Sequence, residues 1–179
     1  MEDNKTVCGK TYNIIKLLGH GKGGYSYLSE ADGEFFVIKQ IHHEPCDYYS
    51  FGNKIEAEFN DYRRLKDAGI IIPEMFAIDM EKEVIIKEYI EGESIFDLIR
   101  KDTPIEPYLI QVRDMAEKAR NAGLNIDYFP TNFIVHDGII WYVDYECNDY
   151  MDEYSFENWG IRCWSKTPEF MAYLNNTDS

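Results

Sequence analysis

Basic residues are scarce in this sequence: 18 lysines and arginines stand against 33 aspartates and glutamates, which gives a formal net charge of −15. Proteins that bind nucleic acids directly rely on lysine and arginine to neutralise phosphates. The charge therefore argues against nucleic acid as a direct partner and is compatible with a basic partner. A nucleotide would need local backbone amides, a lysine and a metal ion to offset this acidic background.

Cysteines are few and apolar runs are short. The four cysteines form no Cys-x-x-Cys pair, so neither a zinc knuckle nor a dense disulfide framework is indicated. No apolar run approaches the roughly 18 residues that a membrane-spanning helix needs, and the N-terminus lacks the basic and apolar regions of a secretory signal. We therefore expect a reduced, cytoplasmic protein with no membrane partner.

Strand-like segments with a glycine-rich first turn dominate the first half of the chain. The following segments are rich in β-branched and aromatic residues and are expected to form a five-stranded antiparallel sheet: 12–18, 25–30, 34–41, 75–79 and 83–90. The turn between the first two carries Gly19, Gly21 and Gly24. Glycine lets backbone N–H groups approach phosphate oxygens closely, although glycine-rich hairpins also occur without a catalytic role.

A lysine lies within the apolar third strand. Lys39 follows three apolar residues, where a charge is unfavourable unless it is paired; a lysine that extends to water from an edge strand is the alternative. Residues 53–68 have the apolar spacing of a helix, and Glu58 on this helix is placed to face inward and pair with Lys39. Glu56 is the competing partner for Lys39. The alternative is that Glu58 is exposed to solvent, as most carboxylates on helices are.

The second half is expected to form a smaller, mainly helical lobe. The strand pattern ends before Gly92, so we expect a first lobe over residues 1–90 and a second over 91–179. Ser94 is expected to cap a short helix that ends at Arg100. The principal helix is expected over 107–122 and a last short helix over 167–174.

Two carboxylates and an amide flank a predicted hairpin in this second lobe. Asp137-Gly138 is a strong hairpin signal between two apolar strands; Asp127 and Asn132 precede the hairpin and Asp144 follows it. These oxygen donors suit a hard cation such as Mg²⁺. Alternatively, Asp127 and Asn132 are turn residues and Asp144 caps a strand end. The histidines, at positions 20, 42, 43 and 136, lack helical pairing and are expected to lie at the surface.

These motifs, in this order, resemble the protein-kinase-like superfamily over nearly the whole chain. The segment 18–24 resembles the glycine-rich loop and 37–39 the lysine motif of the third strand, while 88–92 is similar to the hinge. The 19 residues from Lys39 to Glu58 suit the lysine–glutamate pair of the family. Asp127 and Asn132 match its catalytic loop, and residues 144–146, Asp-Tyr-Glu, stand in place of Asp-Phe-Gly.

Within this superfamily the chain resembles the compact, atypical branch: RIO-type kinases, the kinase subunit of a tRNA-modification complex, lipopolysaccharide kinases and small bacterial predicted serine/threonine kinases. The resemblance implies one α+β domain over residues 1–179 with a two-lobed protein-kinase-like fold and a shortened C-terminal lobe. It also implies a small serine/threonine protein kinase that transfers the γ-phosphate of ATP to a hydroxyl. The acceptor, a protein or a small molecule, is not identified.

The resemblance implies roles for individual residues. Asp127 would act as the catalytic base, and Asn132 and Asp144 would hold Mg²⁺ or Mn²⁺. Whether Glu146 joins Asp144 at the metal or faces solvent stays open. ATP would be bound by Gly19, Gly21, Gly24, Lys39, Glu58, Glu88 and Ile90.

Two positions depart from the family pattern. Asn125 stands where the catalytic loop has histidine, and Ile126 stands where arginine or glycine is usual. Two alternatives to a protein kinase therefore stay open: a small-molecule kinase similar to aminoglycoside or choline kinases, and a nucleotide-binding pseudokinase module without transfer activity.

Overall fold

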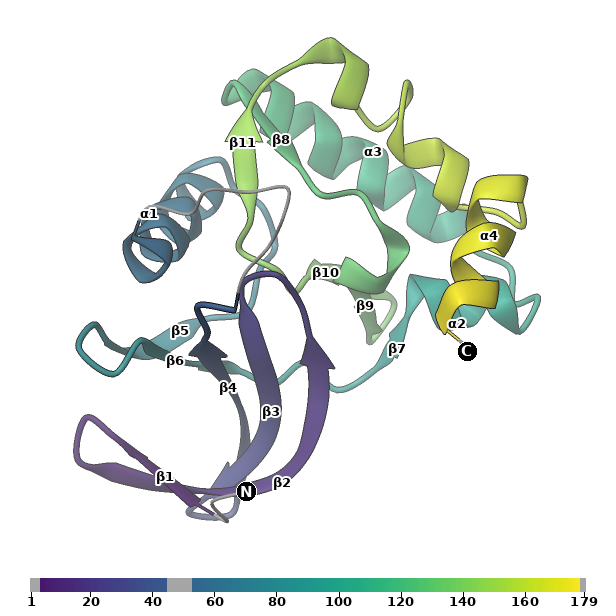
Figure 1. The fold of residues 1–179 in the computed structure, drawn as a ribbon. Coiled ribbons are helices and arrows are strands. Elements are labelled where there is room, and N and C mark those ends of the chain that lie inside the picture. Colours follow the sequence, from purple (N-terminus) through teal and green to yellow (C-terminus); the bar gives the residue numbers. More distant parts are fainter. Residues whose placement is uncertain (1–3, 45–52, 178–179) are drawn as a thin grey trace. The chain divides into compact units, whose positions relative to one another are not determined.

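The computed structural model describes residues 4–44 and 53–177 (Figure 1). The chain forms two compact units. The first comprises the residues up to Asn60 together with Pro73–Tyr89, and the second comprises Asp61–Ile72 together with the residues from Ile90 onward. Helix α1 (Lys54–Asp67) contributes to both. The expected lobe boundary after residue 90 lies one residue from the change of unit at Tyr89–Ile90, but residues 61–72 are counted with the second unit.

The first unit is built on one antiparallel sheet with the strand order β1-β2-β3-β4-β6-β5 (Figure 1). Its six strands are β1 (Asn4–Val7), β2 (Lys10–His20), β3 (Gly24–Ala31), β4 (Glu34–Ile41), β5 (Met75–Asp79) and β6 (Val84–Glu88). The five expected strands are all present. The expectation of five strands in total was wrong, because β1 adds a sixth at the edge.

Strand β1 escaped the sequence reading because most of it is polar. Only Val7 is buried among its four residues, so the segment shows no apolar run. The signal lies in the turn that follows. Cys8 and Gly9 join β1 to β2 with positive φ angles of 48° and 82°, which is the conformation of a tight two-residue hairpin turn.

Apolar side chains on one face of this sheet form its core. The buried cluster consists of Val7, Tyr12, Ala31, Phe36, Ile38, Val84 and Ile86. Because successive side chains of a strand point to opposite faces, Lys39 lies on the other face of β4 from Ile38. The register fixes its position along the sheet, opposite Ser26 on β3 and Ile85 on β6.

The second unit combines helices with short strands. Its elements after α1 are β7 (Glu93–Ser94), α2 (Ile95–Arg100), α3 (Glu106–Asn121), β8 (Leu124–Ile126), β9 (Phe133–His136), β10 (Ile139–Tyr142), β11 (Cys147–Asp149) and α4 (Pro168–Thr177). The strands form two small sheets, β10-β9-β7 and β11-β8. The three expected helices are confirmed, with Ser94 capping α2 through the amide of Asp97. Within the described residues, no helix combines the length and apolar character that a membrane crossing requires.

The hairpin at residues 133–142 forms as expected. Asp137 and Gly138 have φ angles of 49° and 77°, and β9 pairs antiparallel with β10. Side chains of this hairpin, Phe133 and Tyr142, belong to an aromatic core. Tyr128, Phe133, Tyr142, Phe156, Trp164 and Phe170 are among the largest fully buried side chains of the described residues. This core holds the loop between β8 and β9, which carries Asp127 and Asn132.

The glycine-rich turn offers a test of this packing. A Cβ atom on Gly24 would overlap with the carbonyl oxygen of Gln40 on β4, whereas one on Gly19 would meet no atom within 4 Å. We expect Gly24→Ala to lower the free energy of unfolding by about 1–3 kcal/mol. Gly19→Ala, the matched control, should change it by less than about 0.5 kcal/mol. Urea denaturation of the full chain measures both, and equal stability of the two variants would contradict the packing described.

Candidate functional site

The glycine-rich turn of the first unit lies beside the ammonium group of Lys39. The amide of Gly21 donates to the carbonyl oxygen of Gly24 across 3.1 Å and closes the turn. A Cβ atom on Gly23 would lie 3.7 Å from Lys39 Nζ, and none of the atoms around Gly19 or Gly21 would obstruct one. At its glycine positions, the turn therefore exposes backbone that no side chain covers, next to the positive charge of Lys39. Both features favour the binding of phosphate.

Lys39 forms an ion pair with Glu58 of α1. Lys39 Nζ lies 2.5 Å from Glu58 Oε1, and the two side chains are only 13% and 10% exposed. Glu56, the competing partner, is exposed. The expected pairing of Lys39 with Glu58 is thus present in the structure, and it holds the ammonium group in one orientation. Its role toward a nucleotide stays a prediction.

In the second unit, hydrogen bonds tie Asp127, Asn132 and the residues before Asp144 together. Asn132 Nδ2 donates to the carbonyl oxygen of Asp127 across 3.4 Å, and the amide of Val143 donates to the carbonyl oxygen of Asn132 across 2.9 Å. The carboxylates are also oriented locally. Asp127 Oδ1 accepts from the amide of Phe129, and Asp144 Oδ1 accepts from the amide of Tyr145.

Tyr142 lies among these groups and was missed by the sequence reading. Its hydroxyl accepts from the amide of Asp127 across 3.2 Å and donates to the carbonyl oxygen of Glu146 across 2.7 Å. The side chain is fully buried. Burial, followed by the charges of Asp144 and Asp127, raises the pKa of Tyr142 well above its ordinary value. Both carboxylates therefore lie close enough to act on one buried, neutral hydroxyl.

The sequence offered only a weak signal for Tyr142, which stands two residues before Asp144. All four residues of β10 are apolar or aromatic, so no alternation marked it, and its burial together with Ile140 is a finding of the structure. A buried tyrosine needs a partner for its hydroxyl, and here the partners are backbone groups of the two segments that carry the carboxylates.

Trp164 and Gly160 hold the loop that follows Asp127 in place. Trp164 Nε1 donates to the carbonyl oxygen of Tyr128 across 2.7 Å. Gly160 lies so close that a Cβ atom on it would meet Tyr128 Cβ at 2.6 Å. These contacts fix the backbone next to Asp127, which is what a catalytic carboxylate requires of its surroundings.

The two departures from the family pattern have structural explanations. Asn125 is buried; its Nδ2 donates to the carbonyl oxygen of Tyr154 and its Oδ1 accepts from the amide of Met151. It thereby ties β8 to the segment after β11. Ile126 is 4% exposed and packs in the core. Both residues stabilise the second unit.

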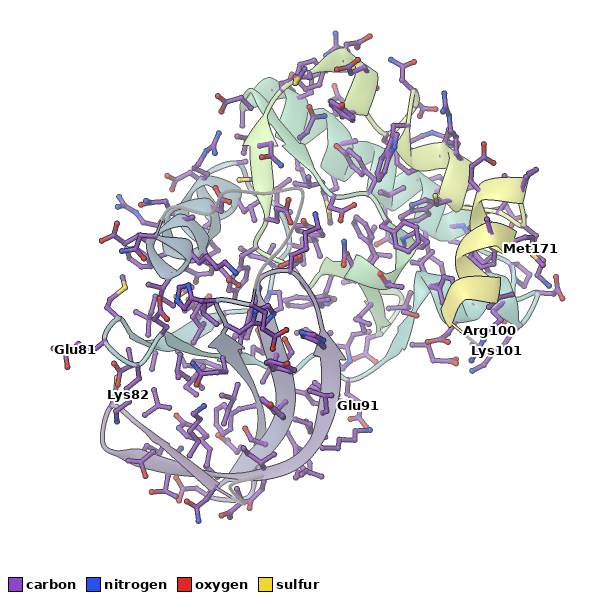
Figure 2. All side chains as sticks on the ribbon, viewed as in Figure 1. Glu81, Lys82, Glu91, Arg100, Lys101 and Met171 are labelled. Carbon is purple, nitrogen blue, oxygen red and sulfur yellow. The ribbon has the colours of Figure 1, made fainter. Side chains whose placement is uncertain are left out.

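The expected hinge residues are distributed over both units. The amide of Glu88 donates to the carbonyl oxygen of Glu74, and Glu88 Oε2 accepts from the amide of Glu74, so this amide is used within the sheet. Ile90 is 8% exposed. Glu91, labelled in Figure 2, accepts a hydrogen bond at its carbonyl oxygen from His136 Nδ1. Their roles toward adenine stay predictions.

The donor set in the second unit fits a hard divalent cation. Asn132 and Asp144 offer an amide and a carboxylate oxygen, the ligand types that Mg²⁺ and Mn²⁺ prefer. The carboxylates of Asp127 and Asp144 both act on the Tyr142 hydroxyl, and a cation would relieve their mutual repulsion. Glu146 is exposed, which favours the alternative that it faces solvent.

Comparison with known proteins identifies the family. No protein-family model matches the chain. The chain is 31% identical over 153 residues to the KEOPS complex subunit Bud32 of Pyrococcus abyssi (strain GE5 / Orsay), and the alignment covers 77% of this chain and 69% of that protein. The chain belongs to the Bud32 family of atypical, protein-kinase-like proteins. The resemblance to the atypical branch of the superfamily is thereby confirmed, as is the α+β fold class apart from the strand number.

The hydrogen bond between the amide of Asp127 and the hydroxyl of Tyr142 can be tested by substitution. Tyr142→Phe removes the hydroxyl that satisfies two backbone groups in the interior. Because an unsatisfied buried group costs about 1–3 kcal/mol, we expect a loss of this size in the free energy of unfolding. Tyr154→Phe is the matched control, since Tyr154 is 50% exposed and should tolerate the change. Denaturation curves that place both variants at the stability of the unmodified protein would refute the position given to Tyr142.

Proposed function

We propose that the chain is an ATP-dependent phosphotransferase that moves the γ-phosphate of ATP to a hydroxyl group, with a protein serine or threonine as the favoured acceptor. The observation that carries the proposal is the ion pair of Lys39 with Glu58 beside the glycine-rich turn. A largely buried lysine that is held by a glutamate and lies next to a glycine-rich turn has the chemistry of a phosphate-binding site. Membership of the Bud32 family supports the same conclusion.

In this proposal the first unit binds the nucleotide. The backbone around Gly19 and Gly21 approaches the phosphate oxygens, since a Cβ atom at either position would meet no atom within 4 Å. The amide of Gly21 exchanges its hydrogen bond to Gly24 for one to phosphate. Gly24 continues the same backbone, although contact with β4 is by itself a sufficient reason for glycine there. Lys39, oriented by Glu58, neutralises the α- and β-phosphates. The carbonyl group of Glu88, and the backbone of Ile90 where the second unit begins, are the proposed contacts to adenine.

The second unit supplies the metal ligands and the base. Asn132 and Asp144 hold Mg²⁺ or Mn²⁺, which when bound neutralises charge on the phosphates. The carboxylate of Asp127 orients the acceptor hydroxyl and accepts its proton. Its orientation is set by the amide of Phe129, and its backbone is fixed by Tyr142 and Asn132.

A basic protein segment is the acceptor that the charge favours. The net charge of −15 attracts cationic partners over distances of about 10 Å at moderate salt. The relative from Pyrococcus abyssi is named as a subunit of a complex, so we also propose that this chain works with a protein partner. A cationic small molecule and a nucleotide-binding module without transfer activity remain the alternatives that experiment has to distinguish.

Substitution of Asp127 tests the proposed base. We expect Asp127→Ala to lower ATP turnover by about 10²–10⁴-fold, the usual contribution of a positioned acid–base group, because the acceptor hydroxyl loses its proton acceptor. ATP should still raise the melting temperature, since Asp127 is not a proposed ligand of the nucleotide. Turnover is measured with Mg²⁺ and with Mn²⁺, and the thermal shift alongside it.

The matched control is Asp114→Ala on α3, whose exposed carboxylate pairs with Lys118 at 2.8 Å. It should leave turnover unchanged. Unaltered turnover in Asp127→Ala would show that the base is assigned wrongly. An ATP-dependent shift without turnover in the unmodified protein, across protein and small-molecule acceptors, would favour the module without transfer activity.

Substitution of Asp144 tests the proposed metal site separately. With one of its oxygen ligands lost, Asp144→Ala should lose most of the additional thermal stabilisation that Mg²⁺ gives to the ATP complex. The smaller shift with ATP in the presence of a chelator should persist, because Lys39 and the glycine-rich turn are intact. A full Mg²⁺-dependent shift in Asp144→Ala would place the metal elsewhere.

A further inference from the structure

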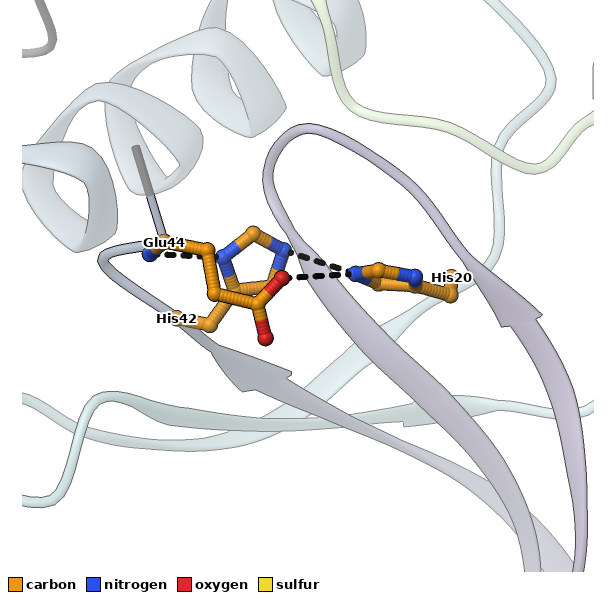
Figure 3. A group of neighbouring side chains, drawn as sticks. All are labelled: His20, His42 and Glu44. Atoms are coloured by element: carbon orange, nitrogen blue, oxygen red, sulfur yellow. Dashed lines mark hydrogen bonds and ion pairs between the residues drawn. The ribbon is translucent and has the colours of Figure 1, made fainter. Parts of the chain in front are cut away.

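Two histidines and a glutamate converge beside the glycine-rich turn. His20 ends β2, and His42 and Glu44 follow β4. Figure 3 shows the three side chains directed toward one another from these two segments. His20 is exposed as expected, whereas His42 is half-buried. Nothing in the sequence pattern indicated that the two histidines meet.

Two of the separations between these three groups are those of ligands around a tetrahedral ion. His20 Nε2 lies 3.2 Å from His42 Nε2 and 3.3 Å from Glu44 Oε2, and one ligand atom from each residue lies within 4.8 Å of the others. Zinc binds imidazole nitrogen and carboxylate oxygen at about 2.0–2.2 Å, so tetrahedral ligands lie about 3.3 Å from each other. The two measured separations match this edge length.

Neighbouring groups hold two of these side chains in place. Tyr25 donates from its hydroxyl to Glu44 Oε1 across 2.5 Å, which leaves Oε2 directed toward His20. The ring of Tyr25 also stacks on that of His20, with the centroids 4.2 Å apart and the planes at 3°. Such outer contacts orient the ligands of protein metal sites.

The hydrogen bonds of His42 show what metal binding would change. His42 Nε2 lies 2.9 Å from the carbonyl oxygen of Gly21, which can only accept, so Nε2 carries a proton. Its Nδ1 accepts from the amide of Glu44 across 3.2 Å. A bond from Nε2 to a metal ion requires that the neutral ring carries its proton on Nδ1 instead. The ion would thus replace both hydrogen bonds, the one from Nε2 to Gly21 and the one that Nδ1 accepts from the amide of Glu44.

Lys54 supports the same region from α1. This lysine is 6% exposed, and its Nζ donates to the carbonyl oxygens of Lys22 and His42 at 3.1 and 2.7 Å. The glycine-rich turn and the segment after β4 are therefore already joined by a buried cation. A metal ion at the three residues would join the same two segments a second time.

We propose that His20, His42 and Glu44 form a binding site for a divalent ion of the zinc class, with water as the fourth ligand, and that the bound ion fixes the glycine-rich turn. Two imidazoles and one carboxylate select Zn²⁺, or Co²⁺ as its substitute, over Mg²⁺. The ligands of this site are different residues from the proposed oxygen donors, Asn132 and Asp144. Only the consequence for nucleotide binding rests on the proposed function; the metal site does not.

Equilibrium binding of Zn²⁺, and of Co²⁺ as a visible-absorption probe, to the full chain tests the proposal. An excess of Mg²⁺ and the absence of nucleotide keep the oxygen site from contributing. We expect one Zn²⁺ per chain and a tetrahedral Co²⁺ spectrum. Loss of an outer partner alone weakens metal affinity by about 10–100-fold, so loss of a ligand in His20→Ala or His42→Ala should weaken binding at least as much. Glu44→Gln should weaken it in the same direction.

Two control variants make the result decisive. His43→Ala removes a neighbouring exposed histidine that contacts Glu83 instead and should bind Zn²⁺ as the unmodified chain does. Asp144→Asn alters the oxygen site and should also leave Zn²⁺ binding unchanged. The proposal is overturned if the unmodified chain binds no stoichiometric Zn²⁺, if His20→Ala and His42→Ala bind it unchanged, or if Asp144→Asn abolishes binding. Because no nucleotide is present, failure of the proposed phosphotransferase would not alter any of these readings.

Discussion

The ion pair between Lys39 and Glu58 constrains the rest of the first unit. Removing two charges from water is costly, and their attraction compensates only when the geometry is good. That geometry requires β4 to be held in register by β3 and β6, and α1 to present Glu58 at the matching height. The side chains of Lys39 and Glu58 are only 13% and 10% exposed, so loss of either partner would leave the other charge unpaired and largely shielded from water. The pair thus couples the formation of the sheet to the placement of the helix, and it leaves the ammonium group beside the glycine-rich turn.

In the second unit, the carboxylates of Asp127 and Asp144 place two negative charges close to the buried hydroxyl of Tyr142. Tyr142 contributes a neutral hydroxyl whose partners are the backbone of Asp127 and of Glu146, while the hairpin and the aromatic core hold both segments. The segments that carry the carboxylates are therefore positioned by hydrogen bonds of their own backbone. The repulsion between the carboxylates remains, and it favours a cation with oxygen ligands.

The two metal sites that we propose differ in their donor atoms. Amide and carboxylate oxygens at Asn132 and Asp144 suit a hard ion, whereas the imidazoles of His20 and His42 suit a borderline one. The same chain is thereby expected to distinguish two classes of metal ion. In the first unit the ligands sit on the segments that also carry the glycine-rich turn and the Lys54 contacts. An ion bound in the first unit would restrict the movement of the backbone. An ion bound in the second unit would neutralise the charge of the carboxylates.

Features that depend on local pattern follow directly from the amino-acid sequence. Strand alternation, the helix periodicity around Glu58, the Asp137-Gly138 turn and the motif spacing predicted five strands, the helices, the hairpin and the ion pair. Local pattern also explains the misses: β1 is polar apart from Val7, so it carried no signal. Only the tertiary structure decided that Tyr142 joins the two acidic segments, that Gly24 packs against β4, that Asn125 supports β8, and that His20 meets His42. Each of these depends on a contact between segments far apart in the chain, and periodicity within one segment contains no information about its neighbours in space.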